Sequence, residues 1–304
     1  MAASEAIETF PCFGSTVGVY VVGRGPAGDQ AKAASLAKRR LLEWHRQFSR
    51  FEPGSELSQL NSDQRQTVAV SPVMARLIEA TLEAAQTSGG LVDGTLVGEL
   101  EEAGYASHFD AAPLNLVETL RRAPVRAPAG PSPRSRWREV SIDPVAGTVT
   151  RPAGLRFDSG GIAKGLFGDI LAGILSLHEG FAVDSGGDVR LGGAAGIARA
   201  VQVANPFDGS ILHSFQLAAG AVATSAISNR SWLDADGRPA HHLLDPATGR
   251  PAFTGIVQAT AIAPNGVIAE TLAKTAVLRG PGDCAGTLRY GGVVVYDDRS
   301  FDVL

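Results

Sequence analysis

The stretch FDSGGIAKG, residues 157–165, decides how the middle of this chain folds. A short β-prone run, residues 155–157, leads into it, and the paired glycines at positions 160 and 161 end that run. Beyond them, apolar residues recur at helical spacing, namely Ile162, Leu166, Phe167, Ile170, Leu171 and Ile174. The pattern predicts a strand, a glycine turn and a helix, in that order.

The predicted turn has the chemistry of an anion site. Gly160 and Gly161 let a ligand approach the backbone closely, and the free N–H groups of a first helical turn favour negative charge. Lys164 adds a positive charge within that turn. A tight connection beside a solvated Lys164 explains the same residues, and the Walker A spacing does not fit them.

A second glycine segment, FAVDSGGD at residues 181–188, starts with a short apolar strand, residues 181–183. The adjacent Gly186 and Gly187 at its end suggest a bulge or a close approach by another group. Asp188 is suited to accept hydrogen bonds from the hydroxyls of a ligand or from a backbone turn. Because Asp and Gly are ordinary turn residues, this pattern alone favours the structural role.

A third segment, HHLLDPATGRP at residues 241–251, predicts a strand closed by a turn over residues 245–249. Adjacent strand side chains point to opposite faces, so only one of His241 and His242 is expected to enter a site. A neutral imidazole suits the role of general base toward a hydroxyl near neutral pH. A histidine in the core or on the surface is the alternative for either position.

Taken together, these three segments resemble the ApbE family of flavin transferases, enzymes that move FMN from FAD onto a threonine or serine of a target protein. FGST at residues 13–16 resembles the MGT segment of that family, and FSRFEPGSELSQLN at residues 48–61 resembles its S-x-Y-x-P-x-S-E-L-S-x-L-N signature. Further similar segments follow in the family order: LVDG at 91–94 with LEEAGY at 100–105, Thr224-Ser225 with Arg230, and AETLAKTAVLRG at 269–280. This ordered agreement over almost the whole chain is more specific than any one motif.

The resemblance implies a site and a reaction. FAD is expected across the glycine turn, and His242 is expected to deprotonate the target hydroxyl, which attacks the FMN-side phosphorus while AMP departs. If water takes the place of the hydroxyl, the same site hydrolyses FAD to FMN and AMP. The implied flavin-binding residues are Phe13, Ser15, Phe51, Leu91, Val92, Asp93, Asp158, Gly160, Gly161, Lys164, Asp188, Ser225 and Arg230.

The resemblance also implies Mg²⁺, held by an Asp, a Thr and a backbone carbonyl at the position of Gly161. Here Glu270 and Lys274 occupy the places of that Asp and that Thr, and a protonated lysine has no lone pair for a metal. Three interpretations stay open: a helix ion pair between Glu270 and Lys274, an ammonium in the place of the cation, or a one-residue shift that brings in Thr275. Metal binding is therefore in doubt, and a non-catalytic FAD-binding protein is an alternative function.

Other positions depart from the family pattern where a ligand is expected. The signature tyrosine is Phe51, which keeps a ring for stacking but lacks the hydroxyl. Phe13 replaces the methionine before the first glycine, and Ala226 replaces the glycine after Thr224-Ser225.

Composition excludes several other classes of protein. The chain has 304 residues, a net charge of −4 and no basic block interleaved with aromatic residues, so nucleic acid is not an expected partner. The nearest candidate, residues 39–50, has Leu41, Trp44 and Phe48 at helical spacing, which indicates an amphipathic helix with a solvated basic face. Cys12 and Cys284 are the only cysteines, and no zinc spacing occurs.

The organisation predicted along the chain is α+β: one compact ApbE-like unit, residues 1–304, of mixed sheets with flanking helices. We expect a strand at 16–22, helices near 31–50 and 72–86, a proline-rich loop at 123–138, and a hairpin at 139–151 that turns at 143–147. Residues 1–12 lack a signal-peptide pattern, and no apolar run is long enough to cross a membrane, so we expect a cytoplasmic protein without membrane insertion.

One glycine motif suggests a rival fold. GRGPAG at residues 23–28 fits GxGxxG, follows a predicted strand and precedes a helix, as in a Rossmann dinucleotide site. No following strand with a ribose-binding acid is visible, and Pro26 among small residues suits a plain loop. The loop is the preferred interpretation.

Overall fold

An eight-stranded antiparallel sheet is the centre of the fold in a computed structural model that describes residues 4–107 and 114–304. Each adjacent pair of strands is antiparallel, with Val19 opposite Val183 and Thr224 opposite Thr260. In spatial order the strands are β1 (Glu5–Cys12), β2 (Ser15–Val22), β6 (Gly180–Ser185), β7 (Val189–Gly192), β10 (Gly220–Ala226), β15 (Ile256–Ala263), β16 (Gly292–Tyr296) and β17 (Phe301–Val303).

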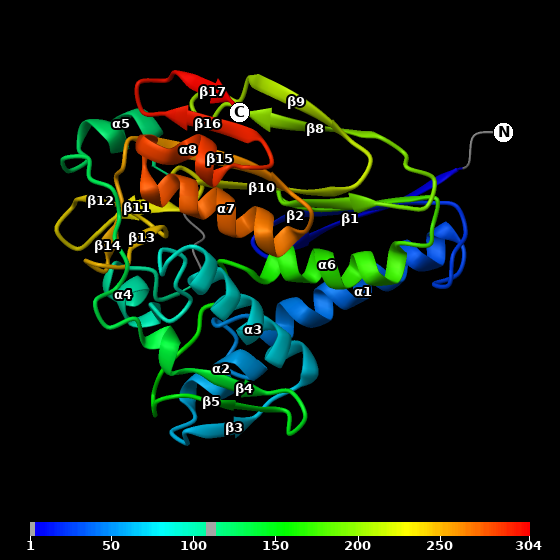
Figure 1. The fold of residues 1–304 in the computed structure, drawn as a ribbon, viewed down its shortest axis with the longest axis horizontal. Coiled ribbons are helices and arrows are strands. Elements are labelled where there is room, and N and C mark those ends of the chain that lie inside the picture. The colour runs from blue at the N-terminus through cyan, green and yellow to red at the C-terminus, as the bar shows by residue number, and fades with distance from the viewer. Residues whose placement is uncertain (1–3, 108–113) are drawn as a thin grey trace.

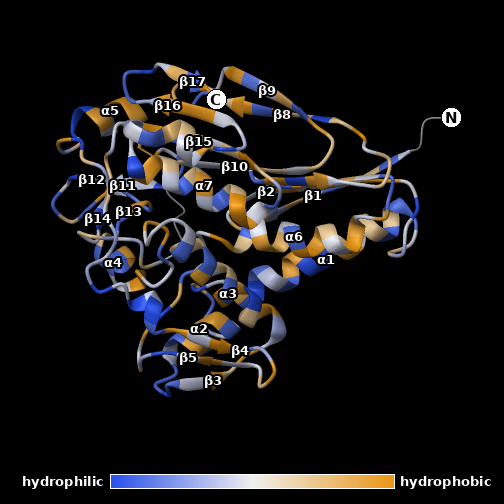
Figure 2. Cartoon of the chain, viewed as in Figure 1, coloured by the Kyte–Doolittle hydropathy of each residue, from blue (hydrophilic) through white to orange (hydrophobic). Residues whose placement is uncertain are grey.

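Three helices cover one face of this sheet (Figure 1): α1 (Gln30–Phe48), α6 (Ala163–Leu175) and α7 (Gly266–Arg279). The side chains of Asp29 and Asn265 cap the first turns of α1 and α7 by accepting backbone hydrogen bonds. Hydrophobic residues run along α6 and the neighbouring strands (Figure 2), and Leu41, Phe167 and Val19 are fully buried between the layers. The apolar helix faces predicted from residue spacing are therefore the core.

The helices α6 and α7 touch backbone to backbone. A Cβ atom added at Gly165 would lie 2.5 Å from the Gly266 carbonyl carbon and oxygen, and one added at Gly266 would lie 2.5 Å from the Gly165 carbonyl oxygen. Only residues without a side chain permit this approach. It places the first turn of α6 beside the first turns of α7.

A smaller layer lies on the other side of these helices (Figure 1), built from α2 (Glu56–Ser62), α3 (Pro72–Thr87) and a sheet with the order β3 (Thr67–Ala69), β5 (Thr148–Thr150), β4 (Ser141–Asp143). The remaining elements are α4 (Val97–Glu102), α5 (Leu116–Arg121), α8 (Cys284–Thr287), the 3₁₀ helices Arg136–Glu139 and Pro281–Asp283, and the ribbons β8 (Arg199–Ala204) with β9 (Ile211–Leu217), β11 (Ser231–Leu233) with β12 (Pro239–His241), and β13 (Leu244–Asp245) with β14 (Arg250–Pro251).

The predicted α+β class of mixed helices and antiparallel sheets is confirmed, as are the strand at 16–22, the two long helices and the hairpin between β4 and β5. Of the proline-rich loop, residues 123–135 contain no helix or strand, and a 3₁₀ helix begins at Arg136. In the described part of the chain no helix is both long and apolar enough to span a bilayer.

The strand predicted at residues 155–157 is wrong. The Asn61 side chain binds the Phe157 backbone on both sides, donating to its carbonyl at 2.8 Å and accepting from its N–H at 2.7 Å. Since a side-chain amide satisfies these backbone groups of Phe157, they are not available to a partner strand, and residues 155–157 belong to no sheet. Local β propensity cannot show such a competition.

The structure also tests the predictions for the glycine pair at 186–187 and for the GxGxxG motif at 23–28. Gly186 and Gly187, with φ of 72° and 96°, form the tight turn between β6 and β7 rather than a bulge. The alternative prediction, a close approach by another group, is confirmed at Gly186, where an added Cβ atom would lie 2.1 Å from the Ser15 hydroxyl. The Rossmann alternative at residues 23–28 is excluded, because β2 has antiparallel neighbours on both sides whereas that site needs a parallel βαβ unit.

Candidate functional site

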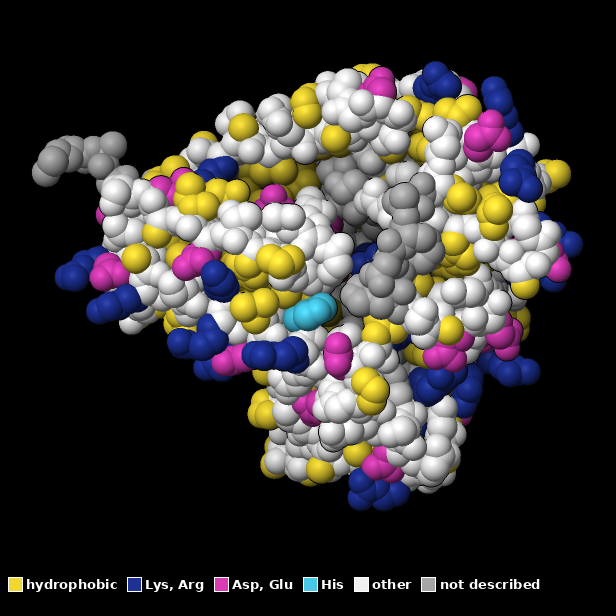
Figure 3. Space-filling view, turned by 180° about the vertical axis from the view of Figure 1, so that it is seen from behind, with side chains coloured by type: hydrophobic (Ala, Val, Ile, Leu, Met, Phe, Trp, Pro, Cys, Tyr) yellow, Lys and Arg dark blue, Asp and Glu magenta, His cyan; other side chains and the backbone are white. Residues whose placement is uncertain are grey.

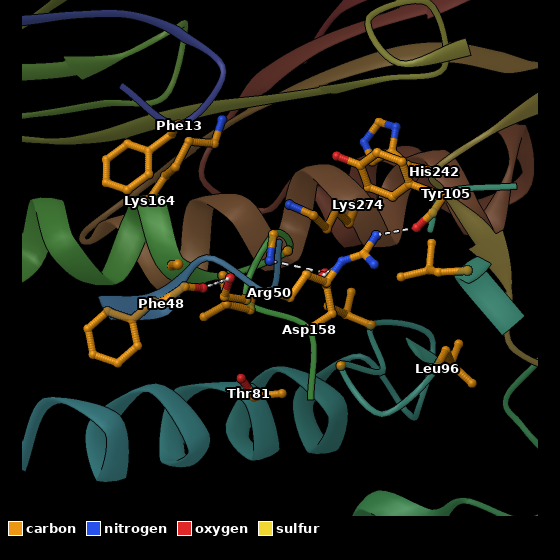
Figure 4. A pocket seen from close by; sticks show the side chains of 18 of the residues that line it. Phe13, Phe48, Arg50, Thr81, Leu96, Tyr105, Asp158, Lys164, His242 and Lys274 are labelled. Atoms are coloured by element: carbon orange, nitrogen blue, oxygen red, sulfur yellow. Dashed lines mark hydrogen bonds and ion pairs between the residues drawn. The ribbon is translucent and has the colours of Figure 1, made fainter. Parts of the chain in front are cut away.

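One cavity brings together segments from across the chain (Figure 4). The residues that line it come from the end of α1, the loop before α4, the glycine turn with the first turn of α6, the segment after β12, and α7. Of the residues predicted from the sequence, the lining includes Phe13, Phe51, Leu91, Val92, Asp93, Asp158, Gly160, Gly161, Lys164, Arg230, His242 and Lys274.

The glycine turn is held by its flanking residues. Asp158 donates its backbone N–H to the Gly94 carbonyl at 2.8 Å, and its carboxylate accepts the Gly160 N–H at 3.0 Å. Neither Gly160 nor Gly161 has a positive φ, so here the glycines matter for the absence of a side chain rather than for their backbone angles. The helix that follows begins without a side-chain cap, which leaves its end open toward the cavity.

Lys164, on the first turn of α6, forms an ion pair with Asp188 and lies 3.5 Å from the Ser185 carbonyl. The other Asp188 oxygen accepts the Thr224 N–H at 3.0 Å, so this carboxylate ties β10 to α6. Burial alone would lower the pKa of Lys164, but the carboxylates of Asp188 and Glu270 outweigh it and raise that pKa. Lys164 is therefore a firmly protonated group whose charge is already paired.

Lys274 reaches the same cavity from α7 (Figure 4). Its side chain lies over the glycine turn, since a Cβ atom at Gly161 would be 3.6 Å from the Lys274 Cε. No ion pair joins it to Glu270 in the described structure, so the helix ion pair does not form. Thr275 points away from the cavity and donates to the Thr271 carbonyl at 2.7 Å, which excludes the one-residue shift.

Glu270 is buried one helical turn before Lys274, with 1% of its surface exposed. Within the described residues, neither of its carboxylate oxygens has a hydrogen-bond partner. Burial raises the pKa of Glu270 to about 7 against the opposing attraction of Lys274, and Asp188 raises it further. Glu270 does not line the cavity. It nevertheless interacts electrostatically with the ammonium groups of Lys274 and Lys164, both of which lower its pKa.

An arginine between two rings forms another part of the lining. The Arg50 guanidinium lies 4.2 Å from the Phe51 ring centre and 4.6 Å from that of Tyr105. It pairs with Asp158 at 3.0 Å and donates to the Tyr105 carbonyl at 2.6 Å, with 6% of its side chain exposed. The predicted solvated basic face at residues 39–50 is therefore wrong at Arg50, which the helix periodicity could not place because α1 ends at Phe48.

Sequence reasoning also missed Tyr105 as a cavity residue. Its ring stacks on Trp232 with centres 5.6 Å apart, and its hydroxyl accepts from Arg230 at 3.0 Å. Burial raises the pKa of this hydroxyl, so it stays protonated. Arg50 lies in segment 48–61 and Tyr105 in segment 100–105, both of which resemble ApbE segments. That resemblance could have identified these two residues as candidates for the site.

The two adjacent histidines point to different surroundings, but not through alternation within one strand, because β12 ends at His241 and His242 lies in the bend that follows. His241 is fully buried against the Phe253 ring, with centres 4.8 Å apart, and its Nδ1 accepts the Leu243 N–H at 3.2 Å. His242 lines the cavity instead (Figure 4). Burial lowers its pKa well below the ordinary value, and the positive charges of Arg230 and Lys274 lower it further. His242 is thus a neutral imidazole at neutral pH.

A model of the ApbE family matches residues 13–294 of this chain. The chain belongs to the ApbE family. It is 26% identical over 288 residues to the FAD:protein FMN transferase of Rhodobacter capsulatus, covering 92% of this chain and 53% of that protein, and so spans about half the length of that relative. It is 27% identical over 301 residues to the FAD:protein FMN transferase of Treponema pallidum, with coverage of 92% and 80%.

Solved ApbE structures share the fold. The ApbE protein of Thermotoga maritima superposes with a TM-score of 0.79 at 23% identity, covering 99% of this chain and 97% of that one. The flavinyl transferase ApbE of Pseudomonas stutzeri, in its apo form, gives 0.77 at 19% identity, with coverage of 100% and 95%. At this identity the likeness concerns the fold.

Four residues that the ApbE resemblance implied for the site lie outside the cavity lining. Asp188 forms the ion pair with Lys164, and Glu270 interacts electrostatically with Lys274 and Lys164, but neither carboxylate lines the cavity. Ser15 lies against the turn after β6, where a Cβ atom at Gly186 would be 2.1 Å from its hydroxyl. Ser225 is buried in β10. Ligand contacts by these four residues stay predictions.

Proposed function

We propose that this ApbE chain is an FAD:protein FMN transferase, which moves FMN from FAD to a threonine or serine hydroxyl of a target protein and releases AMP. The observation that carries the proposal is one cavity with a neutral His242 and the ammonium groups of Lys164 and Lys274 on its walls. A phosphoryl transfer needs a base for the nucleophile and positive charge for the phosphates. The printed names of the relatives from Rhodobacter and Treponema describe this reaction.

The reaction balances with the groups of this cavity. His242 takes the proton of the acceptor hydroxyl, whose oxygen forms a bond to the FMN-side phosphorus of FAD. The bond from that phosphorus to the bridging oxygen breaks, and AMP leaves with the electron pair and then takes up the proton. Neutralisation of the phosphate charge by fixed cations is expected to supply much of the rate, because the cavity does not have to reorganise during the step.

We place the FAD diphosphate over Gly160 and Gly161, with Lys164 and the open first turn of α6 beside it. Phe51 and the segment 91–93 are proposed to surround the adenosine end. Leu91 and Val92 are buried, and burial raises the pKa of Asp93, whose Oδ2 has no hydrogen-bond partner among the described residues. Such an unsatisfied carboxylate oxygen suits a hydroxyl or amino group of a ligand.

The residues present do not fit the Mg²⁺ that the family resemblance implies. Glu270 and the Gly161 carbonyl offer oxygens, but Lys274 offers three donors and no lone pair, and Mg²⁺ requires near-octahedral oxygen ligation. Within residues 4–107 and 114–304, no group of three or more His, Cys, Asp or Glu side chains could hold a metal ion. No step of the proposed reaction therefore uses Mg²⁺.

The cytoplasmic localisation expected from the sequence also stays a prediction.

The proposal is tested by incubating the protein with FAD and threonine-containing peptides of candidate targets, followed by mass spectrometry of the peptide and chromatography of the nucleotides. Covalent FMN on the peptide with equimolar AMP is the expected result. AMP and free FMN without labelling would instead identify a hydrolase. Tight FAD binding without either product would identify an FAD-binding protein and contradict the transferase.

A further inference from the structure

The cavity contains four lysine or arginine side chains in its described lining, and three of them are already engaged. Lys164 is paired with Asp188, and Arg50 with Asp158. Arg230 donates to the Tyr105 hydroxyl at 3.0 Å and to the Phe13 carbonyl at 3.3 Å. These groups can polarise a ligand, but their charge or their donors are shared with the protein.

The ammonium of Lys274 differs from these three. It makes no hydrogen bond and no ion pair with any described residue, although Glu270 attracts it from the preceding turn of α7. The side chain is partly buried and faces the cavity, so its charge has lost part of its hydration without a protein partner in exchange. A site of this kind is stabilised by an anion that enters the cavity.

The position of Lys274 determines which anion it meets. Its stem lies over the glycine turn, 3.6 Å from where a Cβ of Gly161 would be, and the contact of Gly165 with Gly266 holds α6 and α7 together at this point. The side chains of Lys274 and of the paired Lys164 thus reach the same cavity from two different helices, α7 and α6 (Figure 4). A phosphate group placed over the turn would meet two ammonium groups, of which only Lys274 has all three donors free.

We propose that Lys274 is the built-in cation of this site: its ammonium binds the diphosphate of FAD, so that FAD binds without a divalent metal ion. The inference deepens the proposed function and rests on it, because it takes the ligand of the glycine turn to be a dinucleotide diphosphate. It also accounts for the groups around Gly161, where the oxygen that the family resemblance implies at position 274 is replaced by the positive charge of Lys274.

The first test compares FAD with riboflavin, which has the same ring system and no phosphate. Calorimetry is performed in EDTA and again in excess Mg²⁺. The wild-type protein is expected to bind FAD with the same Kd in both conditions, within about twofold. Lys274→Met is expected to weaken FAD binding by roughly 10- to 100-fold, the loss of one charged hydrogen-bond partner, without changing the Kd of riboflavin.

Two variants control this test. Lys32→Met removes the same charge from an exposed position on α1 and is expected to leave both Kd values unchanged. Lys274→Arg keeps the charge and is expected to stay within a few-fold of wild type, which separates loss of charge from loss of folding. The double variant Glu270→Asp with Lys274→Thr restores the residues that the family resemblance implies, and it is expected to bind FAD weakly in EDTA and more tightly in Mg²⁺.

The inference is overturned if Mg²⁺ tightens wild-type FAD binding tenfold or more, or if Lys274→Met binds FAD as wild type does. An equal loss of riboflavin binding in Lys274→Met would also overturn it, since the effect would not be on the phosphates. The transferase proposal is judged separately by peptide labelling. Peptide labelling together with FAD binding that requires Mg²⁺ would keep the transferase and remove this role of Lys274, whereas metal-free FAD binding without labelling would do the reverse.

Discussion

The ammonium of Lys164 on α6 and the carboxylate of Asp188 after β6 form an ion pair that joins a helix to the sheet at the edge of the cavity. The side chains are 24% and 8% exposed, so the pair is partly shielded from water. Its second carboxylate oxygen is also used, since it accepts the Thr224 N–H. Lys164 thus links the glycine segments 157–165 and 181–188, through this ion pair and through its contact with the Ser185 carbonyl.

Replacing Asp188 by Asn is expected to destabilise the protein by about 2 kcal/mol, because Lys164 loses its partner while remaining partly buried. Asn keeps an oxygen for the Thr224 N–H, so the change isolates the charge. Urea unfolding measures the effect. Asp184→Asn is the control: its oxygen accepts the Gly187 N–H at 2.9 Å in the same hairpin without an ion pair in the described structure, and a change below about 0.5 kcal/mol is expected. Equal losses in the two variants would contradict the prediction.

Replacing His242 by Ala is expected to reduce the rate of FMN transfer by about 10²- to 10⁴-fold while the Kd of FAD stays the same, since a general base acts in the transition state. The low pKa of His242 has a second consequence: because the ring stays neutral, protonation of His242 should not lower the rate between pH 8 and pH 6.5. Single-turnover labelling of a peptide across this range measures both. A rate that halves near pH 6.5 also in Glu270→Gln, which lacks the carboxyl group with a pKa of about 7, would show an unperturbed imidazole instead.

Replacing Gly165 by Ala is expected to cost about 1–3 kcal/mol, because the new Cβ would collide with the Gly266 backbone and force α6 and α7 apart. Gly173→Ala in the same helix is the matched control. Its Cβ would meet nothing within 4 Å, so the helix propensity of Ala should stabilise the protein by about 0.5–1 kcal/mol. Thermal unfolding of the two variants should therefore shift in opposite directions, and a shared sign would refute the close contact.

Replacing Glu270 by Gln should change how stability depends on pH. The pKa of Glu270 is about 7 in the folded protein against an ordinary value of 4.5, so between these values the folded state binds more protons than the unfolded state. Stability contributed by this group therefore falls as pH rises through this window, by about 3 kcal/mol. Urea unfolding in EDTA should give similar stabilities for both proteins at pH 4.5, with the variant more stable at pH 8.

The buried histidines act with the opposite sign, since burial lowers the pKa of His241 to about 3 and stability falls as pH drops below its ordinary 6.5. This contribution is common to wild type and Glu270→Gln, so it cancels in the difference between them. A difference that is constant with pH would show that Glu270 is ionised throughout.

Local sequence patterns predicted the elements that depend on neighbouring residues. The helical spacing after Gly161 gave α6 to within one residue of its start, and the paired glycines before Asp188 marked a strand end. The family resemblance selected His242 over His241, which strand alternation alone left open. The strand at 155–157 failed because its backbone is bound by Asn61, a residue 96 positions away from Phe157.

From its sequence alone this protein was determined to be an α+β chain with glycine turns, basic side chains and a histidine in the order of the ApbE family, because spacing and residue type act over a few positions. Only the tertiary structure decided which of these basic side chains form ion pairs within the protein. Lys164 meets Asp188 and Arg50 meets Asp158, while Lys274 remains without such a partner in the described residues. Partner choice depends on contacts between helices and strands far apart in the chain, and electrostatic pairing follows distance in space rather than position in sequence.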